Sequence, residues 1–192
     1  MIVSIILGMG MPTTAAYAVA ASVVAPGLGG LIEPTLMGFA DPDRTSRLIA
    51  HFFVFYFAVL SAITPPVALA AYAAAGISGA DAMKTSFAAF GVGLAAFVVP
   101  FVFFYSPAML LEGSTVQAIQ VACTALIGVY MLSAGVRGFM LAPLNTLQRG
   151  LLLAGALCMI KGGIVTDVAG IAIGLAVFLP QRRAIRALQP AE

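Results

Sequence analysis

The chain has 192 residues, of which 62% are hydrophobic and only 8% are charged, and its formal net charge is +2. A soluble domain carries about a quarter charged residues because its surface faces water, so this composition excludes an ordinary soluble enzyme or binding module. The small positive charge does not indicate a nucleic-acid partner, and we expect membrane lipid to surround most of the chain.

The first apolar segment, residues 1–28, is interrupted at residues 8–14 by two glycines and a proline. Each half is shorter than the roughly 20 residues of a straight membrane-spanning helix, which predicts a re-entrant hairpin or a discontinuous helix. Its tip is expected to present backbone amides and carbonyls to a substrate or ion. An ordinary loop or a packing kink is the alternative. The predicted site residues are Gly10, Pro12, Thr13 and Thr14.

The next segments are a polar loop, residues 29–47, and an apolar stretch, residues 48–105, predicted to hold a broken helix and a further transmembrane helix. Residues 43–46 are expected to cap the broken helix. Its break is the sequence Ser-Ala-Ile-Thr-Pro-Pro at residues 61–66. Proline lacks an amide donor and disfavours helix at the residue before it, so carbonyls freed in the break require other partners.

A bound cation is one candidate partner for these carbonyls. Hard cations take oxygen ligands, and we predict sodium bound by Ser61, Thr64 and backbone carbonyls around Pro65 and Pro66. A hydroxyl or a neighbouring helix that satisfies the carbonyls of a plain proline kink is the alternative. The sequence predicts no other metal and no cofactor.

Residues 106–192 are predicted to form additional C-terminal transmembrane helices and a basic tail. Residues 116–136 fit one span, whereas residues 151–179, split by Lys161, form either a hairpin of two short helices or one long helix. If the first segment is re-entrant and residues 151–179 form a hairpin, six loop lysines and arginines face three across the membrane, which places the C-terminus in the cytoplasm. If residues 151–179 form one span, the tail changes sides and the count becomes four against five.

Two ionisable residues lie inside apolar segments. His51 is interpreted as an interfacial residue at the start of a span, and Asp167 as part of a shallow, wet helix end close to Lys161. The chain has one histidine, no HExxH motif and no phosphate-binding glycine loop after a strand. A membrane enzyme is therefore the weaker hypothesis.

Two motifs carry a family resemblance over about residues 1–111. The sequence Gly-Met-Gly-Met-Pro-Thr-Thr-Ala-Ala-Tyr at residues 8–17, followed by residues 24–26, resembles the large membrane subunit of tripartite ATP-independent periplasmic (TRAP) transporters. Residues 50–76, with their Thr-Pro-Pro, are similar to the fused-permease type that works with TAXI-class solute-binding proteins. The unfused members carry Asn and Gly ahead of Thr-Pro-Pro, where this chain has Phe57 and Ser61.

The resemblance implies an all-α, elevator-type transporter built from two inverted repeats, each with a re-entrant hairpin and a broken helix. It also implies sodium-coupled import of an organic anion, such as a carboxylate, delivered by a periplasmic TAXI-type binding protein at a bacterial or archaeal inner membrane. The chain would be the C-terminal portion, with about half a transport site and no transport by itself, and would require a missing N-terminal permease portion or a partner subunit. The rival hypothesis is a membrane scaffold or assembly subunit without its own site.

Overall fold

The computed structural model describes residues 1–39, 41–112 and 114–188, and within these ranges it contains helices and no strand. Within the described residues, five helical segments are long and apolar enough to cross a membrane, judged by length and composition. The expected all-α integral membrane fold is therefore confirmed. The five segments are Thr13–Leu36, Pro42–Ile63, Ala82–Tyr105, Thr115–Arg137 and Val165–Arg182.

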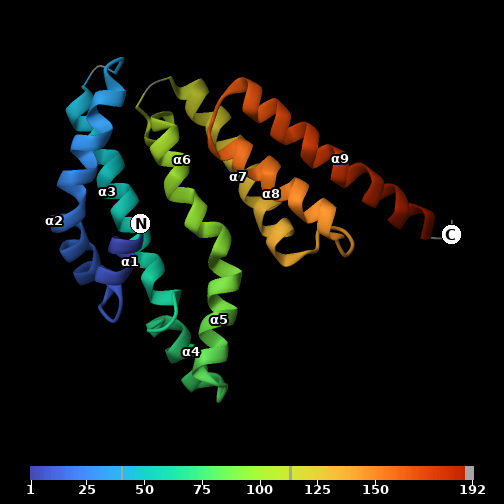
Figure 1. The fold of residues 1–192 in the computed structure, drawn as a ribbon, viewed down its shortest axis with the longest axis horizontal. Helices are drawn as coiled ribbons and strands as arrows, with labels where there is room; N and C mark the ends of the chain where they lie inside the picture. The colour runs from blue at the N-terminus through green and yellow to red at the C-terminus, as the bar shows by residue number, and fades with distance from the viewer. Residues whose placement is uncertain (40, 113, 189–192) are drawn as a thin grey trace. The chain divides into compact units, whose positions relative to one another are not determined.

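Figure 1 shows the helices in chain order. They are α1 Ile2–Gly8, α2 Thr13–Ile32, α3 Pro42–Leu60, α4 Leu69–Ser78, α5 Ala82–Gly93, α6 Val99–Tyr105, α7 Thr115–Arg137, α8 Thr146–Ile160 and α9 Ile164–Leu188. Short 3-10 segments are η1 Glu33–Leu36, η2 Ser61–Ile63, η3 Leu94–Val98 and η4 Pro107–Leu110. The chain divides into two compact units, residues 1–118 and 119–192.

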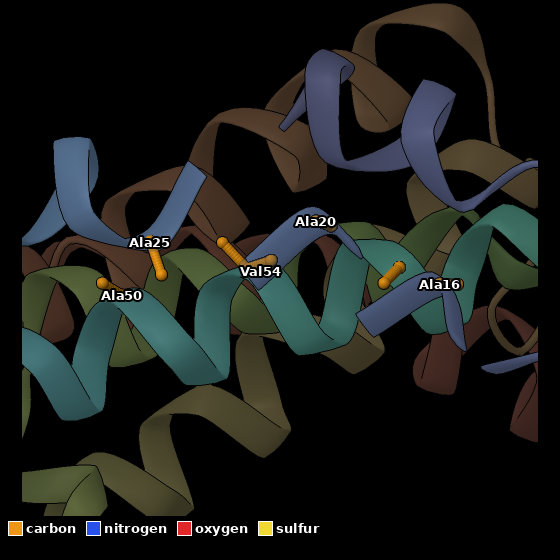
Figure 2. Close-up of a cluster of buried hydrophobic side chains, with 6 residues drawn as sticks. Ala16, Ala20, Ala25, Ala50 and Val54 are labelled. Carbon is orange, nitrogen blue, oxygen red and sulfur yellow. The ribbon is translucent and has the colours of Figure 1, made fainter. Parts of the chain in front are cut away.

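In the first unit, α2 and α3 pack along one another through small side chains. Ala16, Ala20 and Ala25 of α2 form a buried cluster with Ala50 and Val54 of α3, as Figure 2 shows. Lipid is as apolar as these side chains, so association of helices in a membrane depends on close van der Waals contact, which small residues permit. This packing holds together the two helices that adjoin the interruptions predicted from sequence.

The loop between α2 and α3 is shorter than the sequence predicts. The expected loop, residues 29–47, begins only after η1, because the apolar residues 31–32 continue α2. At its other end α3 begins at Pro42, and Asp41 caps it by accepting a hydrogen bond from the Arg44 amide at 2.9 Å. Proline suits the first helical position because an amide hydrogen at that position would have no intrahelical acceptor. The cap expected at residues 43–46 is thus corrected to Asp41.

The position at which α2 ends changes the interpretation of residues 1–28 as a re-entrant hairpin. The second half of the expected hairpin is too short to span a membrane if it ends at residue 28. In the structure α2 continues into η1, and the joined helix, Thr13–Leu36, is 24 residues long. The re-entrant position of α1 and α2 in the membrane stays a prediction.

In the second unit, α8 and α9 form a hairpin. The two helices pack against one another and are joined by residues 161–163, where Gly162 has a φ of +65° that ends the helical path. A Cβ atom added to Gly170 of α9 would lie 2.9 Å from the carbonyl oxygen of Gly155 in α8, so the two backbones approach closely. Of the two arrangements considered for residues 151–179, the structure has the hairpin, although α9 is long at 25 residues.

Asp167 differs from its interpretation as part of a wet helix end. The residue is only 5% exposed, and its Oδ1 atom has no hydrogen-bond partner among the described residues. Asp167 lies in the first turn of α9, where the free amides of the helix end favour a carboxylate. Packing therefore buries this residue even though it lies beside the charged turn at Lys161.

Candidate functional site

The two interruptions predicted from the sequence lie against each other. Gly8, the last residue of α1, packs on the end of α3. A Cβ atom built on Gly8 would lie 2.7 Å from Ser61 Oγ and 3.1 Å from the carbonyl oxygen of Ala58. Only a glycine allows this approach, so the first interruption is fitted directly to the second.

The first interruption is a tight turn between two helix ends. Gly10 has a φ of +78°, a conformation that glycine adopts without strain, and a Cβ atom there would lie 3.7 Å from Val67 Cγ1. Pro12 is extended and precedes α2, and its carbonyl accepts the Ala16 amide at 2.9 Å. The earlier amides of α2 have no intrahelical acceptor, as at every helix start, and no side chain in the described part of the chain caps them.

The second interruption follows from its two prolines. Thr64, which precedes Pro65, leaves the helix with φ −94° and ψ 121°, as the residue before a proline is expected to do. The Ser61 hydroxyl donates to the carbonyl of Ala58 at 2.6 Å, and the Thr64 hydroxyl donates to the carbonyl of Leu60 at 2.8 Å. Both hydroxyls are thereby oriented by the last turn of α3 and keep oxygen lone pairs available.

Three carbonyl oxygens in the second interruption lack a hydrogen-bond donor among the described residues, namely those of Ala62, Ile63 and Pro65. The cause is plain for Ala62, since the residue four positions on is Pro66, which has no amide hydrogen. Neither residues 8–14 nor residues 61–68 include a carboxylate. The oxygen atoms that could bind a cation at this point therefore belong to uncharged carbonyls and hydroxyls.

The structure brings some of the eight predicted site residues together. Ser61 is 2% exposed, and Thr64 and Pro65 are partly buried beside it, so these three form the inner part of the second interruption. Thr13 and Thr14 are exposed at the start of α2 and make no side-chain hydrogen bond within the described part of the chain. Binding roles for all eight predicted residues stay predictions. The exposed members, besides those two threonines, are Gly10, Pro12 and Pro66.

Sequence reasoning missed residues that shape the second interruption. The hydroxyl of Tyr72, in α4, donates to the carbonyl of Pro66. Ala68 adopts the left-handed conformation, with φ +34°, immediately before α4 begins. The six-residue spacing from Pro66 to Tyr72 gives no periodic signal. A tyrosine one turn into an otherwise alanine-rich helix is the single clue that the sequence offers.

A second polar contact joins α2 and α3. The Tyr17 hydroxyl and His51 Nδ1 lie 2.9 Å apart, beside a cavity of about 270 Å³ that Phe52 and Phe55 also line. Because α3 begins at Pro42, His51 is nine residues into the helix, about 14 Å along its axis. The interpretation of His51 as a residue at the start of a span is therefore wrong; it lies near the middle of the helix.

Comparison with known proteins gives one match. The family model described as tripartite ATP-independent periplasmic transporter, DctM component, matches residues 1–119. The matched range contains both helix interruptions and all helices from α1 to α6. Searches of the curated proteins and of the solved structures found no match. Since the matched range is more than half of the 192 residues, the chain belongs to the DctM family of TRAP transporter components.

Proposed function

We propose that this chain acts in sodium-coupled import of an organic anion delivered by a periplasmic solute-binding protein of the TAXI type. The DctM family is a family of secondary transporters rather than enzymes, and the five apolar helices fit a multi-pass membrane protein. The observation that carries the finer proposal is the direct packing of Gly8 on Ser61, which joins the two polar interruptions. We expect the protein in the inner membrane of a bacterium or archaeon.

The oxygen atoms available in the second interruption support sodium as the coupling ion. Sodium is a hard cation, and such cations bind oxygen atoms. Carbonyls of unwound transporter helices are common sodium ligands, and those of Ala62 and Ile63 have no hydrogen-bond donor among the described residues. The Thr64 hydroxyl lies in the same interruption, with its proton directed to the Leu60 carbonyl and its oxygen lone pairs free.

The start of α2 supports an anionic substrate. Its first amides have no acceptor among the described residues, and a helix start carries partial positive charge that favours an anion. Thr13 and Thr14 are exposed there and lie next to the turn that contacts the second interruption. A carboxylate near α2 and a sodium ion near Thr64 would then stabilise each other's binding, which is the requirement for coupled transport.

The experiment is thermal unfolding of the purified full chain in sodium chloride and in potassium chloride at equal ionic strength. We expect sodium to raise the melting temperature and Thr64→Val to abolish the rise. Thr85→Val is the matched control, because the Thr85 hydroxyl also donates to the carbonyl four residues earlier, at 2.8 Å, but lies in α5. Equal melting temperatures in both salts would contradict the sodium assignment and favour a scaffold in which both interruptions are packing kinks.

A further inference from the structure

The second unit contains an apolar groove between α7 and α9. Its volume is about 230 Å³, and its lining is almost entirely apolar. Ile127 and Tyr130 of α7 and Ile171 and Phe178 of α9 lie along it, and Gly174 opens it by having no side chain. Pockets for drug-sized ligands have volumes of roughly 300–1,000 Å³ and have converging polar groups. This groove has neither property, so a hydrocarbon chain fits it better than a polar metabolite.

The groove lies on helices that are long and apolar enough to cross the membrane. α7 is one candidate span, and residues 165–182 of α9 form another. Tyr130 is 52% exposed and Leu175 is 49% exposed along the groove, so it is open to the surroundings of the unit. Around a membrane-spanning helix those surroundings are lipid, which makes an acyl chain the natural occupant.

On each of the two helices, the face that lines the groove has an arginine just beyond the lining residues. In α9 the lining residues Ile171, Leu175 and Phe178 are followed at the next helical spacing by Arg182. In α7, Tyr130 is followed two turns later by Arg137, the last residue of the helix. Residues three, four or seven apart share a helix face, so both arginines lie beyond the same end of the groove.

A hydrogen bond brings these two helix ends together. The Leu141 amide, four residues after α7 ends, donates to Gln181 Oε1 of α9 at 3.3 Å. Arg149 adds a third cation at this end, because its guanidinium donates to the carbonyls of Gly135 and Val136 in the last turn of α7 at 3.0 Å each. Cations from three helices therefore meet at one end of an apolar groove.

The charge at this end has no acidic counterpart in the described part of the unit. Between Glu112 and Glu192 the sequence has one carboxylate, Asp167, which lies in the first turn of α9, at the helix end opposite Arg182. Arg137 and Arg182 are exposed, and no carboxylate of the described residues lies within salt-bridge distance of either. Long arginine side chains at such helix ends extend to the lipid headgroups.

We propose that this groove binds an anionic phospholipid, with an acyl chain between α7 and α9 and the phosphate at Arg137 and Arg182. A basic pocket between transmembrane helices is the usual form of such a site. The loop charges predict the same end to be cytoplasmic, where anionic lipid is attractive to basic residues. The lipid would fix the α7–α9 pair independently of any ion or substrate bound in residues 1–118.

The test uses the absence of tryptophan from the sequence. Phe178→Trp gives the full chain a single indole in the groove, and the chain is reconstituted in phosphatidylcholine vesicles that contain brominated phosphatidylglycerol or brominated phosphatidylcholine. We expect the anionic lipid to quench at a lower mole fraction, by a factor of about five for each arginine, which is the typical contribution of one basic residue near an anionic membrane. Equal quenching by the two lipids would overturn the proposal.

Two sets of variants locate the effect. Arg137→Gln with Arg182→Gln, at exposed positions, should remove the preference, whereas Lys84→Gln with Lys161→Gln, which removes the same charge elsewhere, should preserve it. Leu157→Trp places the sole indole on α8 at a position 61% exposed that does not line the groove, and it should show no preference. A preference that survives the double arginine substitution, or that is equal at position 157, would contradict a lipid site in the groove.

Discussion

Replacing Gly8 with alanine tests the contact between the two helix interruptions. The added methyl group would lie 2.7 Å from Ser61 Oγ, 3.1 Å from the Ala58 carbonyl oxygen and 3.2 Å from Ser61 Cβ. Two of these three atoms belong to a side chain that is 2% exposed, and the third is backbone, so none can move aside freely. Overpacking of this kind costs about 1–3 kcal/mol. Alanine regains up to about 1 kcal/mol of helix propensity, so a mid-range overpacking cost of about 2 kcal/mol leaves a net loss of about 1–2 kcal/mol.

The assay is thermal unfolding of the full chain, in which such a loss lowers the melting temperature by about 2–4 °C per kcal/mol for a protein of this size. Gly27→Ala in α2 is the control, because a Cβ atom there meets nothing within 4 Å, and it should be neutral or stabilising. Adding Ser61→Ala to Gly8→Ala removes the closest atom and should recover part of the loss. If Gly8→Ala were as stable as Gly27→Ala, the two interruptions would not be in contact.

Three further predictions concern helix packing and helix ends, each measured by the same unfolding assay. Gly170→Ala should lower stability by about 1–3 kcal/mol, because its Cβ would lie 2.3 Å from Met159 Cγ, whereas Gly150→Ala meets nothing and should be tolerated. Asp41→Ala should cost about 1 kcal/mol through loss of the α3 cap, and an unchanged value would contradict that cap. Arg149→Gln should cost about 1–2 kcal/mol because two charge-assisted bonds to the end of α7 are lost, and full stability would show that they contribute nothing.

Sequence alone was sufficient for the all-α membrane fold, the DctM family and the two interruptions. Long apolar runs predict spanning helices wherever they occur. The prolines at positions 65 and 66 dictate a break regardless of what surrounds them, since neither has an amide to donate. The extended conformation of Thr64 is the local consequence, and it appears where the proline rule predicts it.

What the sequence could not supply depends on contacts distant along the chain. Nothing around Gly8 indicates that its missing side chain leaves room for Ser61, because the partner is 53 residues away. The sequence pattern predicts the wrong position for His51 because it places Asp41 and Pro42 in a loop, whereas α3 begins there. Burial of Asp167 likewise depends on tertiary packing, whereas its neighbour Lys161 and the glycines of the turn indicate only a polar helix end.

The central claim is that the joined interruptions bind sodium, and radioactive sodium binding to the purified full chain tests it most directly. Saturable binding that unlabelled sodium displaces and potassium does not is the expected result. Thr64→Val should abolish this binding, and Thr85→Val should retain it, since the two hydroxyls make the same kind of backbone bond in different helices. No saturable binding by the unmodified chain, or undiminished binding by Thr64→Val, would contradict a sodium site at the second interruption.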